Sequence, residues 1–282
     1  MNVVNEDLTL PALFNVEGKI AVVTGGASGI GAMIASAFVQ NGATVYIASR
    51  KEKALKEFSD ALNRRGPGKC YYVVADLGSK AGCDKLADAI KANESKIHIL
   101  VNNSGNTWGA PYENVPEKEG WDRIMNLNVK SVFYLTVALT PLLAKDATNV
   151  DPGRVINVSS VASVMSNSLD STLAAEGHGL WSYNTSKAAV NHLTTQLAAT
   201  LAPKLITVNA ILPGVFPSRM TSFGYKTQRD RMDASQPMSR TGTAQDMAGV
   251  VLFLASKAAA HMSGAKILLD GGLVASLTRP KL

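Results

Sequence analysis

The sequence predicts a single α/β domain in which a seven-stranded parallel sheet carries helices on both faces. Short runs rich in β-branched residues alternate with longer segments of helical pattern, which is typical of strand–helix–strand units. Several runs are apolar without alternation, as expected of parallel strands that are covered on both faces. No linker or internal repeat divides the 282 residues, so we expect one doubly wound domain.

The alternation defines the individual elements. The predicted strands are 20–24, 44–48, 71–75, 97–101, 155–158, 206–211 and 267–269. The predicted helices are 30–41, 52–65, 79–91, 121–145, 183–201 and 244–255, and Thr243 with Asp246 forms a capping pair for the last one. We place the domain at 17–275, after an N-terminal extension (1–16) and before a C-terminal tail (276–282). A serine-rich insertion (162–181) and a long loop (215–241) interrupt the rhythm, and long loops in compact domains are often functional.

Composition excludes several protein classes. Hydrophobic residues make up 46% and charged residues 18% of the chain, as in ordinary globular proteins. No apolar run reaches the roughly 20 residues of a membrane span, and the acids Glu6 and Asp7 argue against a secretory signal. Two cysteines, Cys70 and Cys83, cannot build a disulfide framework. Cys70 opens an apolar run, so we expect a buried reduced thiol there and a cytoplasmic protein.

The net charge of +6 comes from scattered lysines and arginines. Without a basic block, nucleic-acid binding is disfavoured, and attraction of an anionic cofactor or substrate explains the surplus more simply. The four histidines show no metal-ligand spacing, so no metal is expected.

A glycine-rich turn joins the first strand to the first helix. It runs Gly25-Gly26-Ala27-Ser28-Gly29-Ile30-Gly31. Glycines let the backbone approach a pyrophosphate, while the helix N-terminus offers free N–H groups and a positive dipole end to the anion. Placed at the start of a strand–helix series, the turn predicts a dinucleotide site of the Rossmann type.

The residues after the second predicted strand favour NADP over NAD. In dinucleotide sites an acid about 20 residues beyond the glycines binds the ribose 2′-hydroxyl of NAD. Here Ser49 is followed by Arg50 and Lys51, and no carboxylate stands there. A guanidinium can grip the additional 2′-phosphate of NADP through two hydrogen bonds.

Tyr183 and Lys187 are four residues apart in a predicted helix, so both side chains lie on one face. A free phenol has a pKa near 10, and a nearby ammonium in a dry site would lower it. Such a pair is common and usually structural when it stands alone.

Further motifs give the pair its context. Thr24-Gly25-x-x-x-Gly29-Ile30-Gly31, Asn102-Asn103-Ser104-Gly105, Asn128, Ser160, Tyr183 with Lys187, Pro213-Gly214 and Asp270-Gly271-Gly272 occur in this order. Over nearly the whole chain they resemble the motifs of the short-chain dehydrogenase/reductases. Within that family the chain is similar to 3-oxoacyl-(acyl-carrier-protein) reductases of the rhamnolipid-pathway type and to ketoreductases of fungal secondary metabolism.

The resemblance implies a catalytic group of Asn128, Ser160, Tyr183 and Lys187. Tyr183 would donate a proton to a ketone oxygen while NADPH delivers hydride to the carbon. Lys187 would lower the tyrosine pKa and hold the nicotinamide ribose, Ser160 would polarise the carbonyl, and Asn128 would anchor a proton-relay water. The implied cofactor contacts are Gly25, Ser28, Gly29, Ile30, Gly31, Ser49, Arg50, Asp76, Leu77, Asn103, Ser104, Gly105, Tyr183, Lys187, Pro213, Gly214, Phe216 and Ser218. A homo-oligomer, tetrameric or dimeric, built on the two long predicted helices is also implied.

The chain departs from the family pattern between Ser160 and Tyr183, where it is unusually long. Ser159 therefore remains an alternative to Ser160, and the insertion at 162–181 is expected to lean over the substrate site or to be an inert surface loop. The loop at 215–241 corresponds to the family's substrate lid, and its methionines and aromatics suit an apolar ketone.

Three alternatives remain open. The same site could oxidise a secondary alcohol with NAD(P), or the chain could be a nucleotide-binding scaffold without catalysis. The C-terminal Pro280-Lys281-Leu282 resembles the peroxisomal Ser-Lys-Leu signal imperfectly, so a peroxisomal location is the alternative to a cytoplasmic one. The substrate is expected to be a ketone of the β-ketoacyl, polyketide or cyclic class.

Overall fold

The computed structural model describes residues 5–169, 171, 173–218, 220–222, 229–234 and 236–277. Seven parallel strands form one sheet in the order β3-β2-β1-β4-β5-β6-β7, which confirms the predicted fold class. The strands are β1 (Ile20–Thr24), β2 (Thr44–Ser49), β3 (Lys69–Val74), β4 (Ile99–Asn102), β5 (Gly153–Val158), β6 (Ile206–Pro213) and β7 (Lys266–Leu269). Each predicted strand is present, and its bounds differ from the prediction by no more than two residues.

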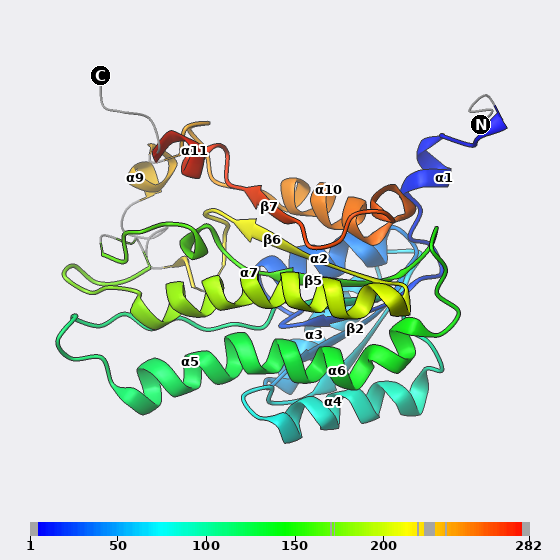
Figure 1. Ribbon diagram of the computed structural model, residues 1–282, viewed down its shortest axis with the longest axis horizontal. Coiled ribbons are helices and arrows are strands. Elements are labelled where there is room, and N and C mark those ends of the chain that lie inside the picture. Colours follow the sequence, from blue (N-terminus) through cyan, green and yellow to red (C-terminus); the bar gives the residue numbers. More distant parts are fainter. Residues whose placement is uncertain are drawn as a thin grey trace.

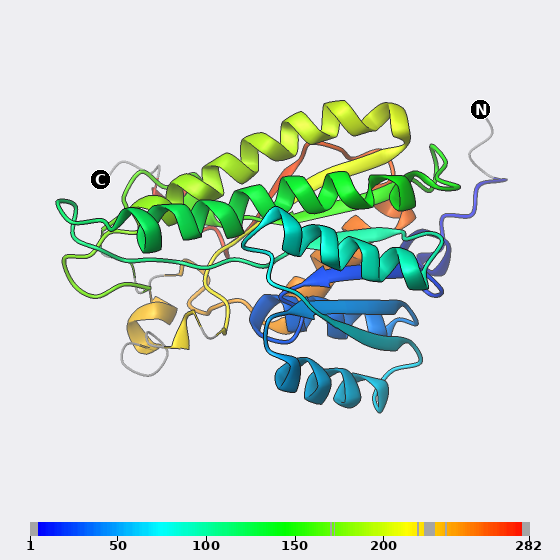
Figure 2. The same cartoon turned by 90° about the horizontal axis from the view of Figure 1, so that it is seen from below.

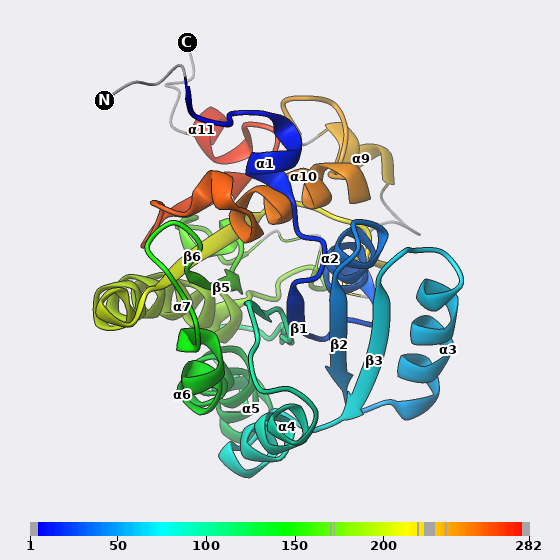
Figure 3. The ribbon, with the colours of Figure 1, turned by 90° about the vertical axis from the view of Figure 1, so that its right-hand side faces the viewer.

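Helices cover both faces of the sheet (Figure 1, Figure 3). α2 (Gly29–Gln40), α3 (Glu52–Asn63) and α10 (Ala244–Ala255) lie on one face, while α4 (Lys80–Asn93), α6 (Ser131–Ala144) and α7 (Trp181–Leu201) lie on the other. The shorter helical elements are α1 (Leu10–Phe14), η2 (Glu117–Asp122), α5 (Arg123–Met125), η3 (Asn126–Lys130), η4 (Val161–Ser163), η5 (Ala202–Lys204), α9 (Arg229–Ala234), η6 (Lys257–Ala259) and α11 (Leu273–Leu277). Sequence patterning missed α1, α9 and α11, which are too short to show a period.

Each face of the sheet has its own hydrophobic cluster. Phe38 of α2 and Val251 of α10 pack with Val23 on one side. Leu135 of α6 and Leu197 of α7 pack on the other side. Full burial of one such side chain stabilises the fold by about 1.5–3 kcal/mol, so the apolar strands are held from both faces.

Both cysteines are buried and free, which confirms the prediction made for Cys70. Burial raises the pKa of Cys70 and of Cys83 to about 11. Thiols with such pKa values stay protonated and unreactive at neutral pH.

The segment Glu117–Ala144 is one continuous helix that includes two π-helical stretches, η2 and η3. By length and composition alone this helix could cross a membrane, which the search for apolar runs in the sequence did not anticipate. Half of its most apolar window is buried inside the structure. Figure 2 shows the helix beside α7. The side chains of Phe133 and Val137 in this helix are exposed.

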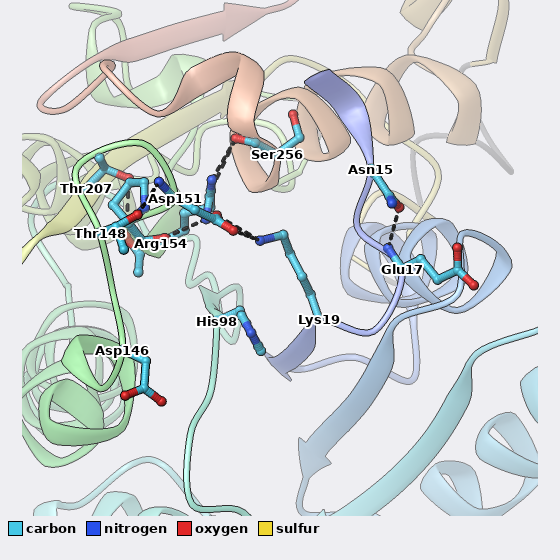
Figure 4. A network of polar contacts seen from close by, with 12 residues as sticks. Asn15, Glu17, Lys19, His98, Asp146, Thr148, Asp151, Arg154, Thr207 and Ser256 are labelled. Atoms are coloured by element: carbon cyan, nitrogen blue, oxygen red, sulfur yellow. Dashed lines mark hydrogen bonds and ion pairs between the residues drawn. The ribbon is translucent and has the colours of Figure 1, made fainter. Parts of the chain in front are cut away.

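A polar network closes the amino-terminal edge of the sheet (Figure 4). Lys19 donates to both oxygens of Asp151 at 2.8 and 3.0 Å, and the fully buried Arg154 donates to Asp151 at 2.7 Å and to the Ser256 carbonyl at 2.9 Å. Burial would raise the pKa of Asp151, but the hydrogen bonds from Lys19 and Arg154 outweigh it and hold that pKa below its usual value. Burial lowers the pKa of His98 to about 4, so its neutral ring accepts the N–H of Ile20 at 2.9 Å. The network ties the first residues of β1, β4 and β5 to the turn after α10.

Replacement of Asp151 by Asn is expected to destabilise the protein by about 3 kcal/mol, because it leaves the buried Arg154 and Lys19 without their counter-charge. Urea unfolding followed by circular dichroism measures this loss. Asp84→Asn is the matched control, since Asp84 pairs with Lys80 at 2.6 Å on the surface, where an ion pair contributes below about 1 kcal/mol. Equal losses of unfolding free energy in the two variants would show that the buried network stabilises the protein no more than a surface ion pair does.

Candidate active site

The candidate site is a cavity of about 490 Å³ at the carboxyl-terminal edge of the sheet. The chain leaves β1 toward β2 on one side and β4 toward β5 on the other, so a crevice opens between these neighbouring strands. The predicted site residues that line it are Gly25, Ser28, Gly29, Ile30, Ser49, Arg50, Asp76, Leu77, Asn103, Ser104, Gly105, Tyr183, Lys187 and Ser218. Positions far apart in the sequence therefore meet in one cavity.

The glycine turn has the shape that a pyrophosphate requires. Gly25 and Gly29 have φ values of +66° and +54°, a backbone conformation that favours glycine. The N-cap residue of α2, Ser28, makes no side-chain cap hydrogen bond, so the N–H groups of the first turn are left for a ligand. The residues present fit a dinucleotide phosphate group.

Thr24 joins the glycine turn to the loop after β4. Its hydroxyl accepts the backbone N–H groups of Asn103 and Ser104, each at 2.9 Å, and its carbonyl accepts Asn103 Nδ2 at 2.8 Å. Thr24 is the last residue of β1 and is buried. The sequence predicted Thr24 only as the first residue of the glycine motif. Its hydroxyl, directly before the glycines, is the signal from which the hydrogen bonds to the loop after β4 could have been predicted.

Arg50 and Asp76 lie beside one another on the wall of the cavity. Arg50 Nη1 is 3.8 Å from Asp76 Oδ2, and both side chains are more than half exposed. Asp76 also accepts the N–H of Gly78 at 3.0 Å, which holds the turn after β3. Lys51, the second cation after β2, lines the same cavity, so two cations are available to an anionic group.

Tyr183 lies in the first turn of α7 and is 6% exposed. Burial raises the pKa of Tyr183, and a side-chain hydrogen bond with Ser160 opposes part of that rise. The direction is opposite to the one expected from the sequence. The enclosure of the phenol penalises the phenolate more strongly than the neighbouring polar groups stabilise it.

Lys187 lies one turn after Tyr183, with its Nζ 5.8 Å from the centroid of the Tyr183 ring. The ammonium donates to the Val158 carbonyl at 2.8 Å. Burial lowers the pKa of Lys187 to about 8. A buried lysine with this pKa can exchange a proton close to neutral pH.

The two candidate serines have different partners. Ser159 donates its hydroxyl to the Lys187 carbonyl at 3.0 Å, so this hydroxyl holds α7 against the end of β5. Ser160 accepts the Ala162 N–H at 3.1 Å and hydrogen-bonds to Tyr183. The hydrogen bond therefore favours Ser160 as the partner of the phenol, whereas Ser159, and not Ser160, is among the residues that line the cavity.

Asn128 lies behind the cavity in the π-helical segment η3. Its Oδ1 accepts the Asn106 N–H at 2.9 Å, and its Nδ2 donates to the Asn106 carbonyl and to Ser186, both at 2.9 Å. Asn128 thus connects the loop after β4 to α7. Asn106 and Ser186 were not predicted as site residues, because only the folded chain brings them to Asn128.

Four predicted cofactor contacts are not part of the cavity wall. Gly31 packs beneath the turn against the Gly25 carbonyl, and Gly214 lies against Asp270, so both have packing roles. Phe216 is 3% exposed and packs in the hydrophobic core rather than toward the cavity. Pro213 ends β6 and is likewise outside the wall. The residues that line the cavity in addition to the predicted cofactor contacts are Ala27, Lys51, Ala75, Asn106, Thr107, Leu127, Val158, Ser159 and Met220. Among these, Ser159 is the alternative catalytic serine and Met220 belongs to the predicted lid.

Two other predictions can be compared only in part. The described portion of the 215–241 loop contains α9 and places Ser218 and Met220 at the cavity, while Phe223 and Tyr225 lie outside the described residues. Pro280-Lys281-Leu282 also lies outside them. Within the part of the chain that the structure describes, no group of three His, Cys, Asp or Glu side chains could hold a metal ion.

Comparisons with known proteins agree with this geometry. A family model described as enoyl-(acyl carrier protein) reductase matches residues 25–274. The chain is 41% identical to the rhamnolipids biosynthesis 3-oxoacyl-[acyl-carrier-protein] reductase of Pseudomonas aeruginosa, over 92% of this chain and 97% of the relative. It is 34% identical to the short-chain dehydrogenase/reductase PhomF of Diaporthe leptostromiformis, over 92% of each chain.

Among solved structures, the Pseudomonas aeruginosa RhlG/NADP active-site complex superposes with a TM-score of 0.84 at 40% identity, covering 93% of this chain and 98% of that one. The residues 25–274 that the family model matches include the glycine turn, the loop after β4 and the Tyr183–Lys187 pair. Sequence, fold and site thus agree, and the chain belongs to the short-chain dehydrogenase/reductase family.

Proposed function

We propose that the protein is an NADPH-dependent oxidoreductase that reduces a ketone to a secondary alcohol. One observation carries the proposal: Tyr183, hydrogen-bonded to Ser160, lines the same cavity as a phosphate-binding glycine turn. NADPH, when bound there, would supply the hydride. The names of the relatives support this reading, since one is a 3-oxoacyl reductase and one solved structure is an NADP complex.

The side chains of this protein supply the proton and the orientation. Tyr183 is protonated at neutral pH and can donate its proton to a carbonyl oxygen, and the burial that raises its pKa makes it a weaker acid before a substrate binds. Ser160 would donate a second hydrogen bond to the same oxygen and stabilise its developing negative charge. Lys187, whose pKa is about 8, would return a proton to Tyr183. Asn128 would hold the water that connects Lys187 to solvent.

Oxidation of an alcohol is the competing use of the same residues. It requires Tyr183 as the base and therefore the phenolate form, which burial disfavours. A scaffold without catalysis would have no need of two buried polar side chains, Tyr183 and Lys187, beside a phosphate-binding turn. Arg50 and Lys51 on the cavity wall favour NADP, the cofactor preference that distinguishes reduction from oxidation, so reduction is the direction that we propose.

The substrate that we propose is a ketone of the β-ketoacyl, polyketide or cyclic class. Met220 gives the cavity an adaptable apolar wall, which suits a bulky carbon skeleton. Loss of NADPH absorbance measures the reduction of each candidate substrate. The panel contains a β-ketoacyl thioester, a cyclic ketone and an enoyl thioester, which is the control for reduction of a carbon–carbon double bond. Oxidation of NADPH with the enoyl thioester alone would refute ketone reduction.

Location and assembly complete the proposal. Two buried, free thiols support a cytoplasmic location. The exposed Phe133 and Val137, with an adjoining groove between α6 and α7 that contains Leu193 and His192, support a homo-oligomer built on these helices.

Replacement of Tyr183 by Phe is expected to lower kcat for ketone reduction at least about 100-fold, because the proton donor is lost while the ring remains. NADPH binding, measured by fluorescence titration, should change less than twofold. Tyr71→Phe, at an exposed tyrosine of β3, is the control and should keep the wild-type rate. Undiminished turnover by the Tyr183 variant would eliminate Tyr183 as the acid.

Replacement of Arg50 by Ala is expected to raise the Kd of NADPH about tenfold and to leave the Kd of NADH nearly unchanged, because only NADPH carries the 2′-phosphate. Titration calorimetry with both nucleotides measures the two affinities. Arg65→Ala, just beyond the far end of α3, is the control. Wild-type protein that binds NADH more tightly than NADPH would contradict the cofactor assignment.

Replacement of Phe133 by Glu is expected to split the oligomer, because it places a charge in the apolar face of α6. Sedimentation velocity measures the mass of the particle. A wild-type protein that sediments as a monomer would remove the proposed assembly.

A further inference from the structure

Two loops approach one another beyond the carboxyl-terminal ends of β4 and β5. The first, residues 105–116, follows β4, and the second, residues 164–180, precedes α7 and is described apart from 170 and 172. Neither loop has a helix or strand of its own in its described part, so contacts between them must hold their shape.

The loops are joined by a short antiparallel bridge. The Ala110 N–H donates to the Gly179 carbonyl at 3.2 Å, and the Gly179 N–H donates to the Ala110 carbonyl at 2.8 Å. The Trp181 Nε1–H donates to the same Ala110 carbonyl at 3.2 Å, and the Trp181 ring meets Tyr112 edge-on at a centroid distance of 5.3 Å. We call Ala110, Tyr112, Gly179 and Trp181 the clasp.

Two glycines allow this close approach. A methyl group on Gly179 would lie 2.6 Å from Trp181 Nε1, so the indole occupies the space that a side chain would need. A methyl group on Gly109 would lie 2.8 Å from the Ala174 Cβ of the second loop. Neither glycine has a positive φ, and both are therefore required by packing rather than by backbone conformation.

The clasp holds the first turn of α7. The N-cap residue of this helix, Leu180, makes no side-chain cap hydrogen bond. Its N–H donates instead to the Ser168 carbonyl of the second loop at 2.9 Å, and Asn184 Nδ2 donates to Ser168 Oγ at 3.3 Å. An uncapped helix end frays unless tertiary contacts hold it, and Tyr183 lies in this turn between Trp181 and Asn184.

We propose that Trp181 is a positioning residue for Tyr183, and that the clasp fixes both the phenol and the space available to the larger substituent of the ketone. The proposal rests on the proposed ketone reduction. None of the clasp residues lines the cofactor cavity, so an opened clasp should impair the phenol without impairing the cofactor site.

Gly179→Ala is the main test, because its backbone conformation accepts alanine while the new methyl displaces the indole. We expect kcat to fall at least about tenfold, since a displacement of about 1 Å at a reacting group can cost as much as 100-fold. The ratio of kcat/KM for a long and a short β-ketoacyl thioester should change at least about fivefold. The Kd of NADPH should remain within about twofold, and Gly249→Ala in α10, where a methyl meets nothing within 4 Å, should behave as wild type.

Trp181→Phe and Trp181→Ala separate position from bulk. Phenylalanine keeps an aromatic ring beside Tyr112 but loses the indole N–H donor and part of the ring, so its kcat should lie between those of wild type and Trp181→Ala. Unchanged kcat and unchanged length selectivity in Gly179→Ala and Trp181→Ala would overturn the positioning role.

Proteolysis tests the clasp without reference to catalysis. Glu113 of the first loop and Glu176 of the second are exposed, and a glutamate-specific protease should cleave there faster in Gly179→Ala than in Gly249→Ala. Equal cleavage rates would overturn the clasp itself. A wild-type protein that reduced no ketone would overturn the proposed function instead, and the cleavage rates would still report on the clasp.

Discussion

The hydroxyl of Thr24 accepts two backbone N–H groups from the loop after β4, and the rest of the site depends on this cross-link. β1 and β4 are neighbours in the sheet, yet their chains leave in opposite directions, so a crevice opens where they end. A buried hydroxyl between them sets the separation of the glycine turn and the Asn103–Ser104 segment. That separation fixes the width of the cavity in which a dinucleotide would bind.

Desolvation is the second force that shapes the site. Tyr183 and Lys187 are both buried, and burial raises the pKa of the phenol while it lowers that of the ammonium. Both shifts favour the neutral form of the group, so at neutral pH the site holds a protonated phenol and an amine that can exchange its proton. At the opposite edge of the sheet the buried cations Lys19 and Arg154 are stabilised by an ion pair, because Asp151 provides their counter-charge.

Much of the architecture could be predicted from the sequence because its signals are local. The β-branched runs and the glycine turn depend on neighbouring residues, and α10 begins at the predicted Thr243 capping box. The Tyr183–Lys187 spacing likewise needs only one helical turn. The burial of Phe216 was not predictable in this way, because the motif gives its position in the chain and not the direction in which its side chain packs. The π-helical stretch that contains Asn128 was not predicted from helical periodicity either, and there Asn128 accepts the Asn106 N–H of the loop after β4.

The sequence by itself determined the family resemblance, the doubly wound fold class, the cofactor turn and the identity of the tyrosine–lysine pair. Each of these features depends on residues that are adjacent in the sequence or one helical turn apart. Only the tertiary structure decided between Ser159 and Ser160 as the partner of Tyr183, reversed the expected direction of the phenol pKa and joined Ala110 to Gly179. Each of these depends on enclosure or on contacts between distant segments, and burial and approach are properties of the folded chain as a whole.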